Sequence, residues 1–178
     1  MRNRKSIRLK GYDYSDNGIY FITICTKNRT HFFGEVKEGK VRLSQLGLVA
    51  EQCWKDIPCH YNKVTLDEFV IMPNHVHGIL IINAERVCAE GNVIKQGTYQ
   101  NTFGPQSMNV ASIVRGFKIG VTKYARREEN VSVIWQSRFY DNVIRCETAL
   151  NRVRNYIKRN PSRWKEDCFC RLNSFFGI

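Results

Sequence analysis

Two apolar runs that follow one another, with only Pro73 and Asn74 between them, constrain the fold more than any other feature of the sequence. Both runs, Val64–Met72 and His75–Ile82, are rich in β-branched side chains and have the length of β-strands. Proline removes a backbone donor and favours a turn or bulge. The two runs should therefore form a pair of strands with a tight connection.

The second run opens with His75 and His77, the only two histidines in the chain that stand two positions apart. Side chains alternate between the two faces of a strand, so both imidazoles point to one side while Val76 points the other way into a core. The two rings can therefore converge on one metal ion. By itself, however, an H-x-H pair is more often two half-exposed polar residues on the solvent face of an edge strand.

The remaining elements are indicated by hydrophobic periodicity and by cap and turn residues. In chain order they are a central strand at Ile19–Thr26, a hairpin within His31–Leu43, a helix capped by Ser44 and ended by Pro58, a basic amphipathic helix at Ser107–Arg127, a partly extended stretch at Ile134–Arg145 and a helix at Glu147–Asn160 that Pro161 stops. This order predicts an α+β fold of ferredoxin-like or RRM-like type, with an antiparallel sheet and helices packed mainly on one face.

The length of 178 residues fits one domain, which can bury a core without disulfides or a structural metal. Within this domain we expect a basic N-terminal arm at 1–18, a flexible loop at 83–106 and a basic, aromatic C-terminal tail at 162–178. The seven cysteines include no C-x-x-C pair and are expected to be reduced. No apolar run reaches membrane-spanning length and no secretory signal opens the chain, which predicts a cytoplasmic protein.

The charge balance points to a polyanionic partner. There are 28 Lys and Arg residues against 16 Asp and Glu, a formal net charge of +12. Nucleic acid is favoured over a membrane because no lipidation signal accompanies the excess, although a merely soluble basic surface is the alternative. The candidate contacts are basic, aromatic and polar residues of the arm, the two basic helices and the extended stretch: Arg4, Lys5, Arg8, Lys10, Tyr12, Arg115, Lys118, Lys123, Trp135, Gln136, Arg138, Arg152, Lys158 and Arg159.

Tyr156 and Asn160 lie four positions apart in the last expected helix, so they stand on one face of it. They fall beside Val153, at the edge of the apolar stripe. A tyrosine in such a position is, by itself, usually a packing residue with its hydroxyl in water.

Three motifs occur together in this basic chain: P-N-H-V-H-G at 73–78, W-Q at 135–136 and N-Y-I-x-x-N-P at 155–161. Together they resemble the HUH single-tyrosine transposases, and within these the REP-associated tyrosine transposases. The resemblance runs from S-I-R-L-K-G-Y-D-Y-S at 6–15, through L-D-E-F-V-I-M-P-N-H-V-H-G at 66–78, to Asn160 and Pro161. Each motif alone is weak, but their order and spacing are specific.

The resemblance implies that His75, His77 and Asn160 bind a divalent cation, Mg²⁺ or Mn²⁺, and that Tyr156 is the nucleophile. Its phenol would attack a DNA phosphate and leave a 5′-phosphotyrosine link and a free 3′-hydroxyl, with no nucleotide cofactor. Tyr140 is a rival nucleophile. Relatives often carry histidine where Asn142 stands here, so a proton-transfer role at that position is not carried over.

The implied substrate is single-stranded or hairpin-forming DNA, and the implied role is DNA transposition or a related mobilisation of repeats, with the protein joining the nucleoid when DNA is bound. Relatives work either as homodimers, whose tyrosine helix serves the partner's histidines, or as monomers with the site in one chain. A domesticated protein that binds hairpin DNA without cleaving it, and a non-catalytic RNA-binding module, are the alternatives to turnover.

Overall fold

The computed structural model of the chain describes residues 17–82 and 109–166. Four strands form one antiparallel sheet in the order β4-β5-β1-β6. Their bounds are Gly18–Cys25 for β1, Val64–Met72 for β4, His75–Ile82 for β5 and Tyr140–Ile144 for β6. The predicted strand pair is thus confirmed, and both β5 and β1 are central strands.

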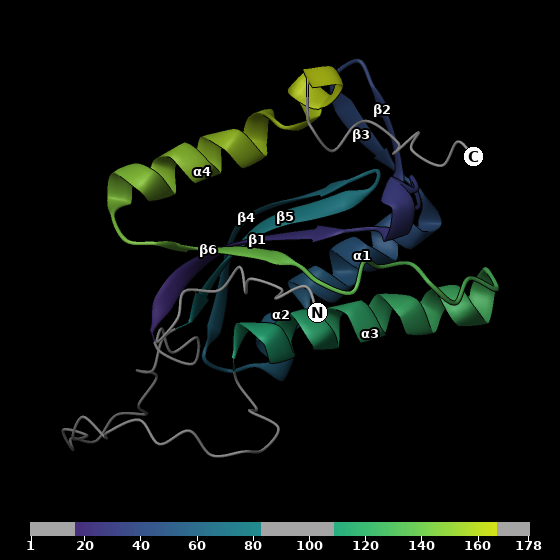
Figure 1. Cartoon of the computed structure of the whole chain (residues 1–178), viewed down its shortest axis with the longest axis horizontal. Coiled ribbons are helices and arrows are strands. Elements are labelled where there is room, and N and C mark those ends of the chain that lie inside the picture. The colour runs from purple at the N-terminus through teal and green to yellow at the C-terminus, as the bar shows by residue number, and fades with distance from the viewer. Residues whose placement is uncertain (1–16, 83–108, 167–178) are drawn as a thin grey trace, which may run out of the picture.

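Helices cover both faces of this sheet (Figure 1). On one face lie α1 at Gln45–Lys55, α2 at Ile57–His60 and α3 at Val110–Glu128, and on the other lies α4 at Glu147–Arg159 (Figure 1). The succession β1-α1-β4-β5-α3-β6 with this strand order is the ferredoxin-like arrangement. The predicted α+β class is confirmed, with three of the four α-helices in the described residues on one face.

Four smaller elements complete the described part. Strands β2 at Gly34–Lys37 and β3 at Lys40–Leu43 form the predicted hairpin, a two-stranded sheet inserted between β1 and α1. Glu38 and Gly39 at its turn both have positive φ, 52° and 72°, as a two-residue hairpin turn requires. The 3₁₀ segments are η1 at Lys27–Arg29 and η2 at Pro161–Glu166.

The main core lies between the sheet and helices α1 and α3. Trp54 of α1 is fully buried and packs directly over Gly78 of β5. A Cβ at Gly78 would stand 2.2 Å from Cζ2 of Trp54, so glycine is needed there for the helix to approach the strand. The glycine of the H-V-H-G motif therefore has a packing role, one residue after His77.

The start of α1 agrees with the prediction and its end does not. The backbone N–H of Gly47 donates to Ser44 Oγ at 3.0 Å, which confirms the predicted cap. The helix stops at Lys55, before the proline expected to end it. Pro58 instead lies in the first turn of α2, where its missing N–H needs no partner.

A second and much smaller apolar cluster lies under α4. It consists of Ile79, Ile144, Leu150 and Ile157, of which only the last two belong to the helix. Helix α4 is therefore a mostly polar element that rests on the sheet through a narrow stripe.

Two predicted segments, the N-terminal arm except for its last two residues and the loop at 83–106, lie outside the described residues. The start of the predicted tail, at 162–166, belongs to η2, and Trp164 is largely buried within it. Within 17–82 and 109–166, no helix is both long enough and apolar enough to cross a membrane.

Candidate active site

The two histidines are buried on a central strand. His75 and His77 are 0% and 1% exposed, and their ring centroids lie 4.5 Å apart. Strand β5 is flanked by β4 and β1, so the interpretation of the pair as half-exposed residues on an edge strand is wrong. Tyr156 of α4 and Trp164 of η2 cover the two rings, with Trp164 stacked against His75 at 5.9 Å between centroids.

The orientation of the His75 ring is set by its neighbour Asn74. Nδ1 of His75 lies 2.8 Å from Oδ1 of Asn74, whose Nδ2 donates to the carbonyl oxygen of Arg29 at 3.2 Å. The amide oxygen faces the ring, so His75 Nδ1 donates and its Nε2 keeps a lone pair. Burial, followed by the charges of His77 and Arg29, holds the pKa of His75 well below its ordinary value, and a hydrogen bond with the Asn160 side chain opposes that shift.

The His77 ring is held between a hydroxyl on either side. Its Nδ1 lies 2.8 Å from Oγ1 of Thr23 on β1, and its Nε2 lies 3.1 Å from the hydroxyl oxygen of Tyr156. Burial lowers the pKa of His77 to about 3, so the ring is neutral at physiological pH. Both histidines are thus neutral imidazoles, the form in which histidine binds metals.

Tyr156 is the exposed member of the group. The residue is 43% exposed, while its ring packs edge-on against Phe21 at 6.0 Å between centroids. The rival Tyr140 lies on β6 opposite Thr23, which in turn pairs with His77. Two strand spacings, roughly 10 Å, therefore separate Tyr140 from the histidine. Of these two tyrosines, only Tyr156 has its hydroxyl at His77.

Asn160 closes the site at the end of α4. It is the C-cap residue, 3% exposed, and its side chain reaches His75. Pro161 follows and begins η2, so the predicted stop of the helix is confirmed.

Two neutral imidazoles and one amide oxygen form a mixed nitrogen and oxygen donor set that suits a divalent cation whose other positions are filled by oxygen. In the ranges 17–82 and 109–166 no three side chains of His, Cys, Asp or Glu gather in one place. A cation here would therefore depend on Asn160 as well as on His75 and His77. The imidazole nitrogens of His75 and His77 and the amide oxygen of Asn160 are donor atoms of the kind that such an ion binds.

Among the predicted DNA contacts, Arg152 and Arg159 line a pocket beside Tyr156. Arg163 of η2, which was not predicted, lines the same pocket. Lys158 instead forms an ion pair with Glu68 of β4, with 2.8 Å between Nζ and Oε1.

A second group of predicted contacts lies along α3, on the opposite face of the sheet. Arg115, Lys118 and Lys123 line a groove between α3 and the 132–139 segment. Lys118 Nζ donates to the carbonyl oxygens of Gln136 and Arg138 at 2.8 and 3.1 Å, and burial lowers the pKa of Lys118 to about 8.

The other predicted contacts differ in setting. Trp135 packs against Phe33 and Phe117, and its Nε1 donates to the carbonyl oxygen of Lys118 at 3.2 Å, so its ring is largely used for packing. The five contacts predicted in the N-terminal arm lie outside the described residues: Arg4, Lys5, Arg8, Lys10 and Tyr12.

Sequence reasoning missed the residues that hold the catalytic candidates in place. Asn74 stands directly before the H-x-H motif and could have been found as an amide next to a candidate ligand. Thr23 and Trp164 carried no local signal, because their contacts with the histidines arise from strand pairing and from the path of η2.

Comparisons with known proteins support the fold. No protein-family model matches the chain. An uncharacterized protein of Haemophilus influenzae is 42% identical over 170 residues, which cover 94% of this chain and 93% of that protein. The structure of a REP-associated tyrosine transposase bound to a REP hairpin is similar with a TM-score of 0.58 at 17% identity, over 88% of this chain and 73% of that one. At this identity, the likeness establishes a shared fold.

Proposed function

The chain belongs to the same protein family as the Haemophilus influenzae protein and has the fold of a REP-associated tyrosine transposase, and on this premise we propose that it is a metal-dependent single-strand DNA endonuclease and strand transferase. Its substrate would be hairpin-forming DNA and its intermediate a covalent 5′-phosphotyrosine. The fold alone does not determine an activity, so the proposal has to rest on the site.

The contact between Tyr156 and His77 carries the proposal. The phenol oxygen lies 3.1 Å from Nε2 of His77, and the phenol is accessible while the two imidazoles behind it are buried. A bulky phosphodiester can thus reach the nucleophile beside a shielded group of metal ligands. A tyrosine with only a packing role would not need this alignment with two oriented, neutral histidines.

In the proposed step, the Tyr156 oxygen bonds to the phosphorus of a phosphodiester, and the bond from phosphorus to the 3′ oxygen breaks. The phenol loses one proton and the leaving 3′ oxygen gains one, so the step needs neither water nor a nucleotide. The downstream strand remains attached to the protein through its 5′ phosphate, and the upstream strand ends in a 3′-hydroxyl. Attack by the 3′-hydroxyl of another strand reverses the chemistry and completes strand transfer.

A phenol with an ordinary pKa of about 10 is mostly protonated at physiological pH, and a phosphodiester repels its ionised form. His75, His77 and Asn160 would hold Mg²⁺ or Mn²⁺, whose chemistry is to draw negative charge from the phosphate and orient it. The protein's own contribution is positional, since Asn74 and Thr23 orient the imidazoles while α4 presents Tyr156 beside them.

Single-stranded DNA or the end of a hairpin suits this site better than a continuous duplex, because a phosphate within duplex DNA is harder to bring beside a phenol on a helix. Arg152, Arg159 and Arg163 would bind the phosphates next to the scissile one. The basic side of α3 would follow the backbone of the same DNA. The related solved structure, described as bound to a REP hairpin, supports this class of partner.

A hairpin oligonucleotide carrying a 3′ label tests the proposal. With Mn²⁺ present, we expect a labelled protein band that survives denaturation, because the attached strand is the one that keeps the 3′ end. A 5′ label should appear only on a released fragment, and chelation of the metal should abolish both products. Tight binding of hairpin DNA without an adduct would support the domesticated binding protein instead, and a preference for RNA hairpins would support the RNA-binding module.

A further inference from the structure

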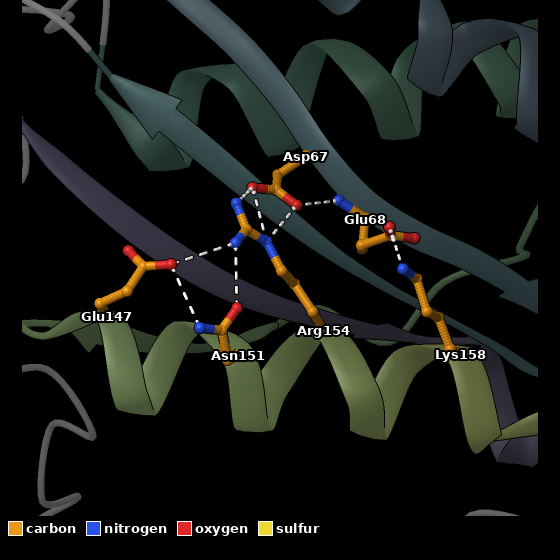
Figure 2. Close-up of polar contacts among 6 residues, drawn as sticks. All are labelled: Asp67, Glu68, Glu147, Asn151, Arg154 and Lys158. Carbon is orange, nitrogen blue, oxygen red and sulfur yellow. Dashed lines mark hydrogen bonds and ion pairs between the residues drawn. The ribbon is translucent and has the colours of Figure 1, made fainter.

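An acidic pair occupies an irregularity in β4. The register between β4 and β5 shifts between Leu66 and Phe69, and Asp67 and Glu68 are the two residues within this shift. A β-bulge redirects side chains relative to a regular strand. Figure 2 shows both carboxylates directed at α4, where Arg154 and Lys158 meet them.

The contact of Asp67 with Arg154 is bidentate. Nη2 of Arg154 donates to Oδ2 of Asp67 at 2.6 Å, and its Nε donates to Oδ1 at 3.0 Å. Such paired, charge-assisted bonds fix an angle as well as a distance. Asp67 is well shielded, with 11% of its side chain exposed, and the hydrogen bond from Arg154 lowers its pKa.

Three further contacts brace the same arrangement. Nη1 of Arg154 donates to Glu147 Oε1 at 3.3 Å and to Asn151 Oδ1 at 3.1 Å, both within α4 (Figure 2). One turn beyond Arg154, Lys158 pairs with Glu68 at 2.8 Å. Two successive turns of the helix are thus bound to two successive residues of β4.

The angular positions of the side chains around the axis of α4 show how these ion pairs affect Tyr156. At 3.6 residues per turn, Tyr156 points roughly 160° away from Arg154, and the apolar residues Leu150 and Ile157 lie between these two directions. The helix therefore rests on its apolar stripe, with the site along one side and the ion pairs along the other. Leu150 and Ile157 are buried in this stripe, and Ala149 and Val153 pack partly buried beside them. Apolar packing is non-directional, so the ion pairs on one side of the stripe add the directional contacts that define the rotation of the helix about its own axis.

We propose that Asp67 and Glu68, whose contacts with α4 are drawn in Figure 2, are positioning residues. They fix the rotation of α4 and so hold the Tyr156 hydroxyl at His77. A rotation of roughly 20° moves the end of a helical side chain by about 2 Å. Displacement of about 1 Å can lower a reaction rate about a hundredfold. This inference rests on the proposed role of Tyr156 as the nucleophile.

Hydrogen exchange of the full-length protein tests whether the ion pairs hold α4 in place, and this measurement does not require enzymatic activity. In Asp67→Asn and Arg154→Met, backbone amides of α4 should exchange about tenfold faster than in the wild type, while those of β1 and β5 stay unchanged. The double variant should show no further increase, because the two residues act through one contact. The matched control is Glu51→Gln, which removes an exposed ion pair with Lys55 on α1.

The rate of adduct formation on hairpin DNA tests the positioning itself. At saturating DNA, Asp67→Asn should lower this rate at least tenfold, with the affinity for DNA unchanged, and Asp67→Glu should recover part of it. Unchanged exchange in α4, equally faster exchange in all elements, or an unchanged rate would overturn the inference. If the wild type forms no adduct, the proposed function fails, while the exchange of α4 still decides whether the acidic pair holds the helix.

Discussion

The hydroxyl of Tyr156 lies 3.1 Å from Nε2 of His77, a residue 79 positions earlier in the chain. The contact joins the central strand β5 to helix α4, and it lies within one chain. The proposed metal ligands, the proposed nucleophile and their supporting side chains thus lie together within one chain. This relationship gives a direct prediction about how the active site works in solution.

Activity should not be restored by mixing two inactive variants. His77→Ala keeps the nucleophile, and Tyr156→Phe keeps the histidines. If each chain builds its own site, a mixture of the two remains inactive on hairpin DNA even where dimers form. Adduct formation by the mixture, at a substantial fraction of the wild-type rate, would show instead that α4 serves the histidines of a partner.

Asn74→Ala should weaken the binding of Mn²⁺ about 10- to 100-fold, because it removes the acceptor that orients the His75 ring. Titration of the protein with Mn²⁺, followed by electron paramagnetic resonance of the free ion, measures this affinity. Asn62→Ala, at an exposed asparagine before β4, is the control and should bind as the wild type does. Equal affinity in the two variants would contradict the role given to Asn74.

Gly78→Ala should destabilise the protein by about 1–3 kcal/mol, because its Cβ would overlap the Trp54 ring in the core. The midpoint of urea unfolding measures the change. At Gly120 of α3 a new Cβ would meet the Cys53 thiol at 3.1 Å, and that side chain can rotate away. Gly120→Ala should thus be neutral or stabilising, because alanine favours the helix. A loss of stability no larger at Gly78 than at Gly120 would disprove the packing argument.

The pairing of Asp67 with Arg154 predicts a pH dependence of stability. The hydrogen bond from Arg154 lowers the pKa of Asp67 in the folded state, so its stabilising contribution is present above the unfolded pKa, about 4, and is lost as the pH falls through the folded pKa. The difference in unfolding free energy between wild type and Asp67→Asn should stay constant from pH 8 to 6 and shrink below about pH 4. A difference that is the same at pH 7 and pH 3 would contradict this linkage.

The strands and helices were predictable because local signals specify them. The β-branched runs on either side of Pro73, the Ser44 cap and the stop at Pro161 act over a few residues, and the structure has the elements that they indicate. The end of α1 was predicted wrongly from Pro58, because a proline is as compatible with the first turn of a new helix as with the end of the previous one.

The sequence indicated residues that the structure brings together, and it did not indicate what surrounds them. Trp164 and Asn160 contact the buried His75, and both approach it only after the chain has crossed the sheet. The contact between Asp67 and Arg154 spans 87 positions and depends on a bulge that no residue pattern announced. Such contacts arise from tertiary packing, which periodicity does not encode.

The most direct test of the account is the identity of the residue that becomes attached to DNA. After reaction with a hairpin oligonucleotide, nuclease treatment and trypsin digestion, mass spectrometry should find the nucleotide remnant on the peptide N-Y-I-K at 155–158, which contains Tyr156. The same remnant on F-Y-D-N-V-I-R at 139–145 would make Tyr140 the nucleophile and would contradict the proposed site.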